Sequence, residues 1–169
     1  MHWKITALVC AMFSYIGFAQ AADSFTIHVA GDTRQCEIPR PSVCRNHTNA
    51  MWMYFDEKGQ IFVYDDVDSG VMLKPGKRSG SYLHKDYPAH TQVSYSKNGE
   101  VYKFNMKITM KRKGIYYNKS MNWSYTFRIN GNKSCVLTQY TATSRVGLRF
   151  SNPRVKHCRI YQGRKRPVF

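Results

Sequence analysis

Acidic residues are scarce in this chain, and they are scarcest where the basic residues gather. The 169 residues include 26 Lys and Arg against 10 Asp and Glu, which gives a formal net charge of +16. Residues 23–70 hold four basic and eight acidic side chains, whereas residues 71–169 hold 21 basic and two acidic ones. This asymmetry predicts a basic surface that meets an anionic partner, or an acidic segment folded over part of that surface.

Long apolar runs are also missing after the first 22 residues. Residues 5–18 form an apolar run that is too short to span a bilayer; it follows Lys4 and precedes Ala19-Gln20-Ala21, the small-x-small pattern read by signal peptidase. The pattern predicts a signal peptide over residues 1–22, with a transmembrane anchor as the alternative. We therefore expect an exported mature chain, periplasmic or secreted, that has no transmembrane segment.

Cysteine is used sparingly. Apart from Cys10 in the apolar run, the chain has Cys36, Cys44, Cys135 and Cys158, an even number that indicates two disulfides in an exported protein. The spacing favours Cys36–Cys44, because a short, proline-stiffened loop separates them and its ends are easily joined. Cys135–Cys158 would then be the second disulfide. A zinc site is disfavoured because neither a Cys-x-x-Cys pair nor a ligand-spaced His pair is present.

No helical periodicity of useful length follows the apolar run, and strand-like alternation takes its place. Along residues 101–111 and 115–130, apolar side chains alternate with polar or basic ones, as they do in a strand with one buried and one solvated face. The dipeptide Asn98-Gly99 suits a two-residue turn that would pair Tyr95 with Tyr102. A two- or four-residue loop around Arg112-Lys113 would pair Ile108 with Tyr117 and Phe104 with Met121, apolar opposite apolar, whereas a three-residue loop would not.

Together these patterns predict an all-β fold for residues 23–169, a single disulfide-stabilised domain with a basic, frayed tail over residues 163–169. We expect an antiparallel meander of about eight or nine strands that closes into a small β-barrel, because closure removes exposed strand edges. A two-sheet β-sandwich is the alternative.

Basic side chains recur on the polar face of the central hairpin. Three lysines occupy every fourth position of one strand, which places neighbours about 13 Å apart. Such a stripe suits an anionic glycan, a lipid headgroup or another polyanion, although a charged face can also serve only to keep a protein in solution. The predicted polyanion-binding residues are Lys103, Lys107, Lys111, Arg112, Lys113 and Arg128.

Two other kinds of binding remain open. The apolar face could line a barrel cavity for a small apolar ligand, or the same side chains could simply fill the interior. The residues concerned are Met106, Met110, Lys119, Met121, Trp123 and Tyr125; Lys119 interrupts the apolar alternation and could lie in a bulge or extend toward solvent. An inhibitor or effector that docks on a protein partner would use the Cys36–Cys44 loop and the tip at residues 111–114.

Catalytic and cofactor motifs are lacking. The chain has no nucleophile elbow, His-Glu-x-x-His, P-loop or dinucleotide fingerprint, and the only local acid–base grouping is His84, Asp86 and His90. The acidic turn at residues 65–68 could attract Ca²⁺, but its spacing does not match an EF-hand loop. We therefore expect a non-catalytic binding module without a cofactor or metal; a small hydrolase is the least supported function.

Overall fold

The computed structural model describes residues 23–38, 43–64, 70–83, 89–110, 119–131, 133–145 and 148–165. Their regular structure consists of ten strands. No helix in these ranges is long and apolar enough to cross a membrane. The strands are β1 (Phe25–Glu37), β2 (Cys44–Phe55), β3 (Ile61–Tyr64), β4 (Gly70–Leu73), β5 (Ser79–Leu83), β6 (Ala89–Asn98), β7 (Val101–Met110), β8 (Lys119–Asn130), β9 (Ser134–Arg145) and β10 (Leu148–Gln162).

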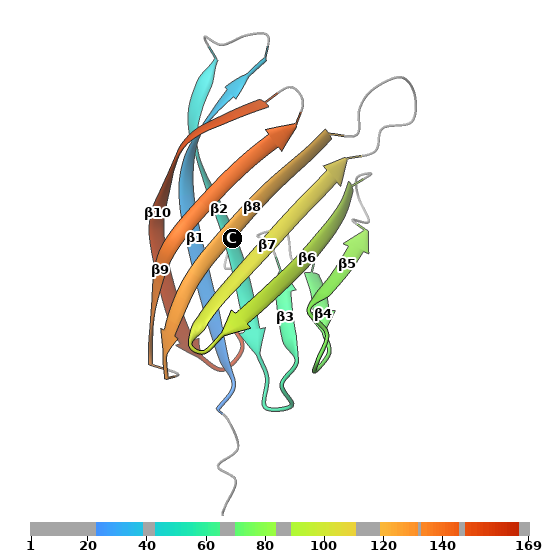
Figure 1. Ribbon diagram of the computed structural model, residues 1–169, viewed down its shortest axis with the longest axis vertical. Coiled ribbons are helices and arrows are strands. Elements are labelled where there is room, and N and C mark those ends of the chain that lie inside the picture. The colour runs from blue at the N-terminus through green and yellow to red at the C-terminus, as the bar shows by residue number, and fades with distance from the viewer. Residues whose placement is uncertain are drawn as a thin grey trace, which may run out of the picture.

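The ten strands form two antiparallel sheets of five strands each (Figure 1). The first sheet has the order β10-β1-β2-β3-β4, and the second has the order β5-β6-β7-β8-β9. Because the last strand pairs with β1, it extends the first sheet instead of closing the second one. The all-β, antiparallel prediction is confirmed. The strands do not close into the expected barrel, and the two-sheet sandwich fits the observed pairing.

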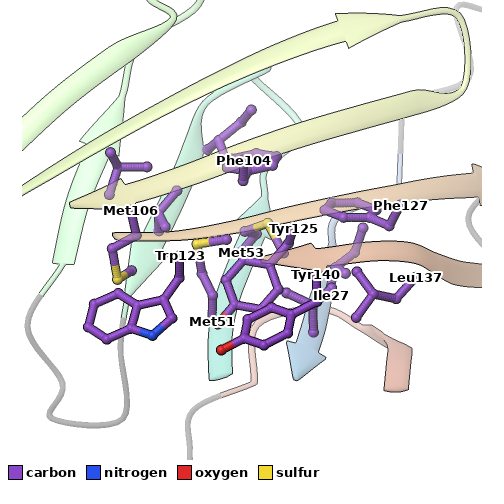
Figure 2. Packing of buried hydrophobic residues seen from close by; sticks show 14 of the residues in the cluster. Ile27, Met51, Met53, Phe104, Met106, Trp123, Tyr125, Phe127, Leu137 and Tyr140 are labelled. Carbon is purple, nitrogen blue, oxygen red and sulfur yellow. The ribbon is translucent and has the colours of Figure 1, made fainter. Parts of the chain in front are cut away.

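The core lies between the inner faces of the two sheets (Figure 2). Met106, Trp123 and Tyr125 are at most 8% exposed, and Met121 packs against them. These side chains therefore help to fill the interior, as the filled alternative to a ligand cavity requires. Met110 is different: at the end of β7 it is 37% exposed, so its predicted place in an interior cavity is wrong. Lys119 begins β8, opposite Met110 in the register.

The predicted alternation is right, but neither predicted register is. Between β7 and β8, Phe104 lies opposite Tyr125 instead of Met121, and Ile108 lies opposite Met121 instead of Tyr117. Asn98 pairs with Val101, so the turn is Gly99-Glu100 and Tyr95 lies opposite Phe104 instead of Tyr102. Gly99 has a φ of +57°, which matches the first central position of a type II′ turn, where glycine is favoured. A shift of two residues leaves every side chain on its predicted face, because strands alternate with a period of two.

β1 continues through Gly31 because this residue leaves room for an aromatic ring from the other sheet. A Cβ atom at Gly31 would lie 2.2 Å from Cγ of Tyr140 on β9. Beyond the glycine, Asn49 Nδ2 of β2 donates a hydrogen bond to the Tyr140 hydroxyl oxygen at 2.6 Å, and both residues are buried. Tyr140 thus joins β9 to the first sheet through shape and a buried hydrogen bond.

Two disulfides have the connectivity expected from the spacing. Cys36–Cys44 joins opposite residues of β1 and β2, and Cys135–Cys158 links β9 to β10 and so ties the two sheets together. Covalent links of this kind are typical of an oxidising compartment.

The start of the C-terminal tail is held against the first sheet instead of being frayed. Thr26 Oγ1 donates to the Gly163 carbonyl oxygen at 2.7 Å and accepts from the Lys165 backbone N–H at 3.0 Å. The guanidinium group of Arg164 lies 5.1 Å from the centre of the Phe62 ring. Residues 163–165 therefore cover part of the outer face of the first sheet.

The Gly31–Tyr140 contact predicts a strong dependence of stability on one methyl group. We expect Gly31→Ala to lower the free energy of unfolding by about 1–3 kcal/mol, because a well-packed ring must move to admit the methyl group. Urea denaturation of the single and double variants measures the effect. In a Tyr140→Ala background the same change should cost much less, since the ring is gone. An equal cost in both backgrounds would contradict the contact.

Candidate functional site

An open groove of about 580 Å³ crosses the outer face of the second sheet. It runs over all five strands, so by strand spacing it is about 19 Å long. Its lining contains ten polar side chains, of which Lys107 is the only charged one among the described residues. These side chains are Ser79, Ser81, Gln92, Ser94, Asn105, Lys107, Asn122, Ser124, Thr141 and Thr143.

The groove follows directly from strand alternation and register. Two rows of outward-facing polar residues run across the sheet. The residues between the two rows face inward, so only their backbone is exposed on this side, and it forms the floor of the groove. One row is Ser79, Ser94, Asn105, Ser124 and Thr141, and the other is Ser81, Gln92, Lys107, Asn122 and Thr143. The serine, asparagine and threonine side chains are short, so they leave the floor open.

Charge of only one sign occurs on the strands of the second sheet. None of β5 to β9 contains Asp or Glu, whereas the five strands together contain six basic residues. Three of the predicted polyanion-binding residues lie here: Lys107 lines the groove, Lys103 is exposed two residues from the lining residue Asn105 on β7, and Arg128 is exposed farther along β8, four residues from Ser124. Lys111, Arg112 and Lys113 lie outside the described residues. The sheet therefore brings together half of the predicted set around a groove.

The lining suits a polyhydroxylated ligand. Hydroxyl groups donate and accept hydrogen bonds, and each carboxamide offers both kinds of atom at fixed positions. Asn122 Nδ2 already lies 3.4 Å from Thr143 Oγ1, which shows that neighbouring strands hold their polar groups within reach of one another. The alternating pattern predicted a wet face here. It did not predict the groove, because a groove depends on the lengths of side chains from five strands.

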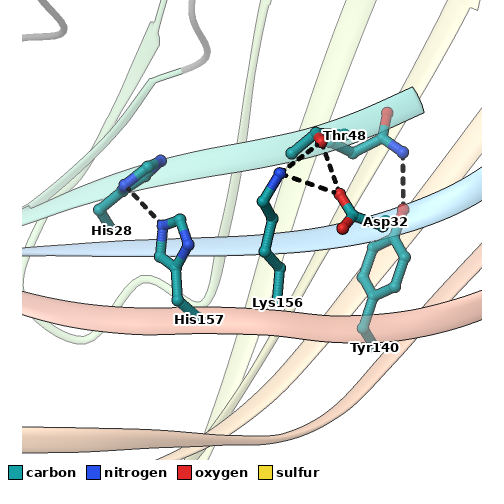
Figure 3. A network of polar contacts seen from close by, with 7 residues as sticks. His28, Asp32, Thr48, Tyr140, Lys156 and His157 are labelled. Atoms are coloured by element: carbon teal, nitrogen blue, oxygen red, sulfur yellow. Dashed lines mark hydrogen bonds and ion pairs between the residues drawn. The ribbon is translucent and has the colours of Figure 1, made fainter. Parts of the chain in front are cut away.

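A polar network occupies the outer face of the first sheet (Figure 3). Lys156 Nζ lies 3.3 Å from Asp32 Oδ1 and donates to Thr48 Oγ1 at 2.9 Å, and the Thr48 hydroxyl donates to the same carboxylate oxygen at 2.5 Å. The Thr48 hydrogen bond, together with Lys156, holds the pKa of Asp32 below its ordinary value. The carboxylate is therefore already satisfied by groups of its own sheet.

Two histidines are in contact on the same outer face of the first sheet. His28 Nδ1 lies 3.1 Å from His157 Nε2, and the His28 ring stacks on Trp52 with centroids 3.9 Å apart. Burial, helped by the positive charge that His157 and Arg159 can carry, lowers the pKa of His28 to about 4. The pair was missed by sequence reasoning because 129 positions separate its members. Its only local signal is that His28 alternates with the buried Ile27 and Val29.

The predicted acid–base grouping is only partly within the described chain. His90 lies on β6 opposite Thr109, while His84, Asp86 and the acidic turn at residues 65–68 lie outside the described residues. Among the side chains that the structure does describe, no three of the His, Cys, Asp and Glu type gather closely enough to hold a metal ion.

The His28–His157 pair predicts a loss of stability in mild acid. The native pKa of His28 is about 4 and the ordinary value is 6.5, so the unfolded chain binds more protons than the native one between these values. The stability that neutral His28 contributes is complete above pH 6.5 and is lost as the pH decreases toward 4. We expect a loss of about 1–2 kcal/mol; solvent around the exposed part of the ring keeps it this small. Thermal unfolding against pH measures this loss.

The variant His28→Gln removes the titrating group and should flatten this part of the pH profile. His47→Gln, at an exposed position of β2, is the matched control and should keep the wild-type slope. Identical slopes for both variants would rule out the pair as the cause.

The two outer faces thus differ in chemistry. The second sheet presents a polar groove with positive charge beside it, and the first sheet presents aromatic rings, a histidine pair and a paired carboxylate. A second depression, of about 460 Å³, lies around Asp32 on the first sheet. The groove, at about 580 Å³, is the larger of the two. No family model, no curated protein and no solved structure matches the chain.

Proposed function

We propose that this protein is an exported, non-catalytic binding module that holds an anionic glycan in the groove of the second sheet. The observation that carries the proposal is the pairing of a polar lining, in which Lys107 is the one charged side chain among the described residues, with a complete lack of Asp and Glu on β5 to β9. The hydroxyl and amide groups suit sugar hydroxyls. Lys107, with Lys103 nearby, suits the carboxylate, sulfate or phosphate groups of the same chain.

The shape of the groove favours a linear glycan over other polyanions. It is open and elongated, and it crosses all five strands, so an extended polymer can lie along it and continue beyond either end. Among the described lining residues the one aromatic side chain, Trp123, is only 8% exposed, so it offers no ring on which a nucleobase could stack, and the apolar residues at the floor face inward. A lipid headgroup would meet the lysines, but the apolar residues at the floor, Val93, Met106 and Trp123, are each at most 8% exposed and so offer acyl chains little surface.

Export rests on the disulfides. Formation of a disulfide oxidises two thiols, so both links favour an oxidising compartment, and the predicted signal peptide at residues 1–22 agrees with this. A periplasmic or secreted location follows from the proposal, and surface polysaccharides are the polyanions that such a protein meets most directly.

Docking on a protein partner is the second candidate, and one observation favours it. Next to the Cys36–Cys44 disulfide, Ile38 and Val43 are 56% and 49% exposed at the end of the β1–β2 hairpin. Exposed apolar side chains that lie close together are typical of surfaces that contact another protein. The apolar-ligand hypothesis is not carried forward, because its core residues pack against one another.

The glycan proposal predicts a selective effect of two lysines. We expect Lys103→Gln/Lys107→Gln to weaken binding of an acidic polysaccharide such as heparin by about tenfold, and to lower the salt dependence of the affinity. Calorimetric titration at several salt concentrations measures both. Lys58→Gln/Lys133→Gln removes the same charge from turns outside the groove and should change the affinity little. Equal losses in the two double variants would overturn the proposal.

Removal of uncharged groups separates groove binding from general charge attraction. Asn122→Ala/Ser124→Ala leaves the net charge unchanged and deletes three polar groups from the centre of the groove. We expect this variant to bind the acidic polysaccharide several-fold more weakly, with an unchanged salt dependence, because a lost hydrogen bond weakens binding without altering ion release. Wild-type affinity in this variant would contradict a groove-bound glycan.

A further inference from the structure

A second depression, of about 460 Å³, lies on the outer face of the first sheet and so on the opposite side of the sandwich from the groove. Its described lining is rich in basic and polar residues from three adjacent strands. The residues are Asp32, Thr33 and Arg34 of β1, Asn46 and Thr48 of β2, and Asn152, Arg154 and Lys156 of β10. We call this depression the arginine pocket.

Two irregularities in β10 shape the arginine pocket. The register between β1 and β10 shifts once between Ala30 and Gly31 and again between Asp32 and Arg34. At each shift β10 has one residue more than β1, and Asn152 in the second takes a φ of +51°. Extra residues of this kind bend a strand and re-aim its side chains, and they occur often beside functional sites. The register places Arg154 opposite Asp32, two positions along β1 from Arg34, and both arginines line the same depression.

The charges in the arginine pocket do not cancel. The only carboxylate in its described lining belongs to Asp32, which is already engaged by Lys156 and Thr48. Arg34 and Arg154 are exposed, and neither forms an ion pair with a carboxylate among the described residues. Two guanidinium groups are therefore free to bind an anion, while Lys156 is held in position at the edge by its own partners.

The chemistry of the donors selects a class of anion. A guanidinium group presents parallel N–H donors that bind two oxygens of one anion at once, and this geometry fits phosphate and sulfate groups. Two guanidinium groups and the amide of Asn46, which lies opposite Arg34, offer more donors than the two oxygens of one carboxylate can use. We propose that the arginine pocket binds the phosphate or sulfate group of a ligand at Arg34 and Arg154, independently of the groove.

Titration with inorganic phosphate and with inorganic sulfate, followed by NMR shifts of the arginine side chains, tests the proposal on the whole protein. We expect saturable binding that Arg34→Gln/Arg154→Gln weakens at least about tenfold. Arg45→Gln/Arg149→Gln removes the same charge from exposed positions on the same strands outside the arginine pocket and should leave the affinity unchanged. Equal losses in these two variants, or binding that never saturates, would overturn the proposal.

Three further arms complete the test. Arg34→Lys/Arg154→Lys keeps the charge and removes the planar donors, so a several-fold loss of affinity is expected, and wild-type affinity would overturn a guanidinium site. A sulfated disaccharide and vesicles containing phosphatidic acid distinguish a glycan from a lipid as the source of the anion. Lys103→Gln/Lys107→Gln should bind phosphate normally, so failure of the groove proposal and failure of this one give different results.

Discussion

The contact of Tyr140 with Gly31 and Asn49 is the constraint on which the arrangement of the two sheets depends. One ring from β9 fills the space that a missing side chain leaves on β1, and its hydroxyl group reaches a buried amide on β2. Burial raises the pKa of Tyr140 to about 12, so the hydroxyl keeps its proton at any ordinary pH. With the Cys135–Cys158 link nearby in the same strand, the edge of the second sheet is fixed against the first by packing, hydrogen bonding and a covalent bond.

That fixed edge lets the two outer faces take different roles. Because the inner faces supply the core, the outer faces do not have to be apolar, and the two sheets can carry different polar residues on them. β5 to β9 carry short polar residues and positive charge, while the first sheet carries the described carboxylate network and stacked rings. The strands of each sheet carry six basic residues, but only the first sheet has acidic ones, Asp32 and Glu37, so the two sheets differ in their carboxylates and not in their number of basic side chains.

Local periodicity predicted which face each residue takes but not its exact neighbours. In β7 and β8 the alternation is so regular that Phe104, Met106, Trp123 and Tyr125 could be assigned to the core correctly. The register depended on one turn, and the glycine of Asn98-Gly99 takes the first central turn position instead of the second. The ends of the strands are harder to predict from the sequence, because Gly31-Asp32 and the polar residues 151–154 resemble turns. Their strand conformation is imposed by Tyr140 and by pairing with β1, which are distant in sequence.

The same reasoning explains why one group of basic residues could be predicted to share a face from the sequence and the other could not. Lys103 and Lys107 belong to one strand, so their common face is visible in the spacing of four residues. Arg34 and Arg154 come from strands at opposite ends of the chain and meet only because β10 returns to pair with β1 and bulges there. A sandwich in which the last strand joins the first sheet can therefore present anion-binding groups on both outer faces.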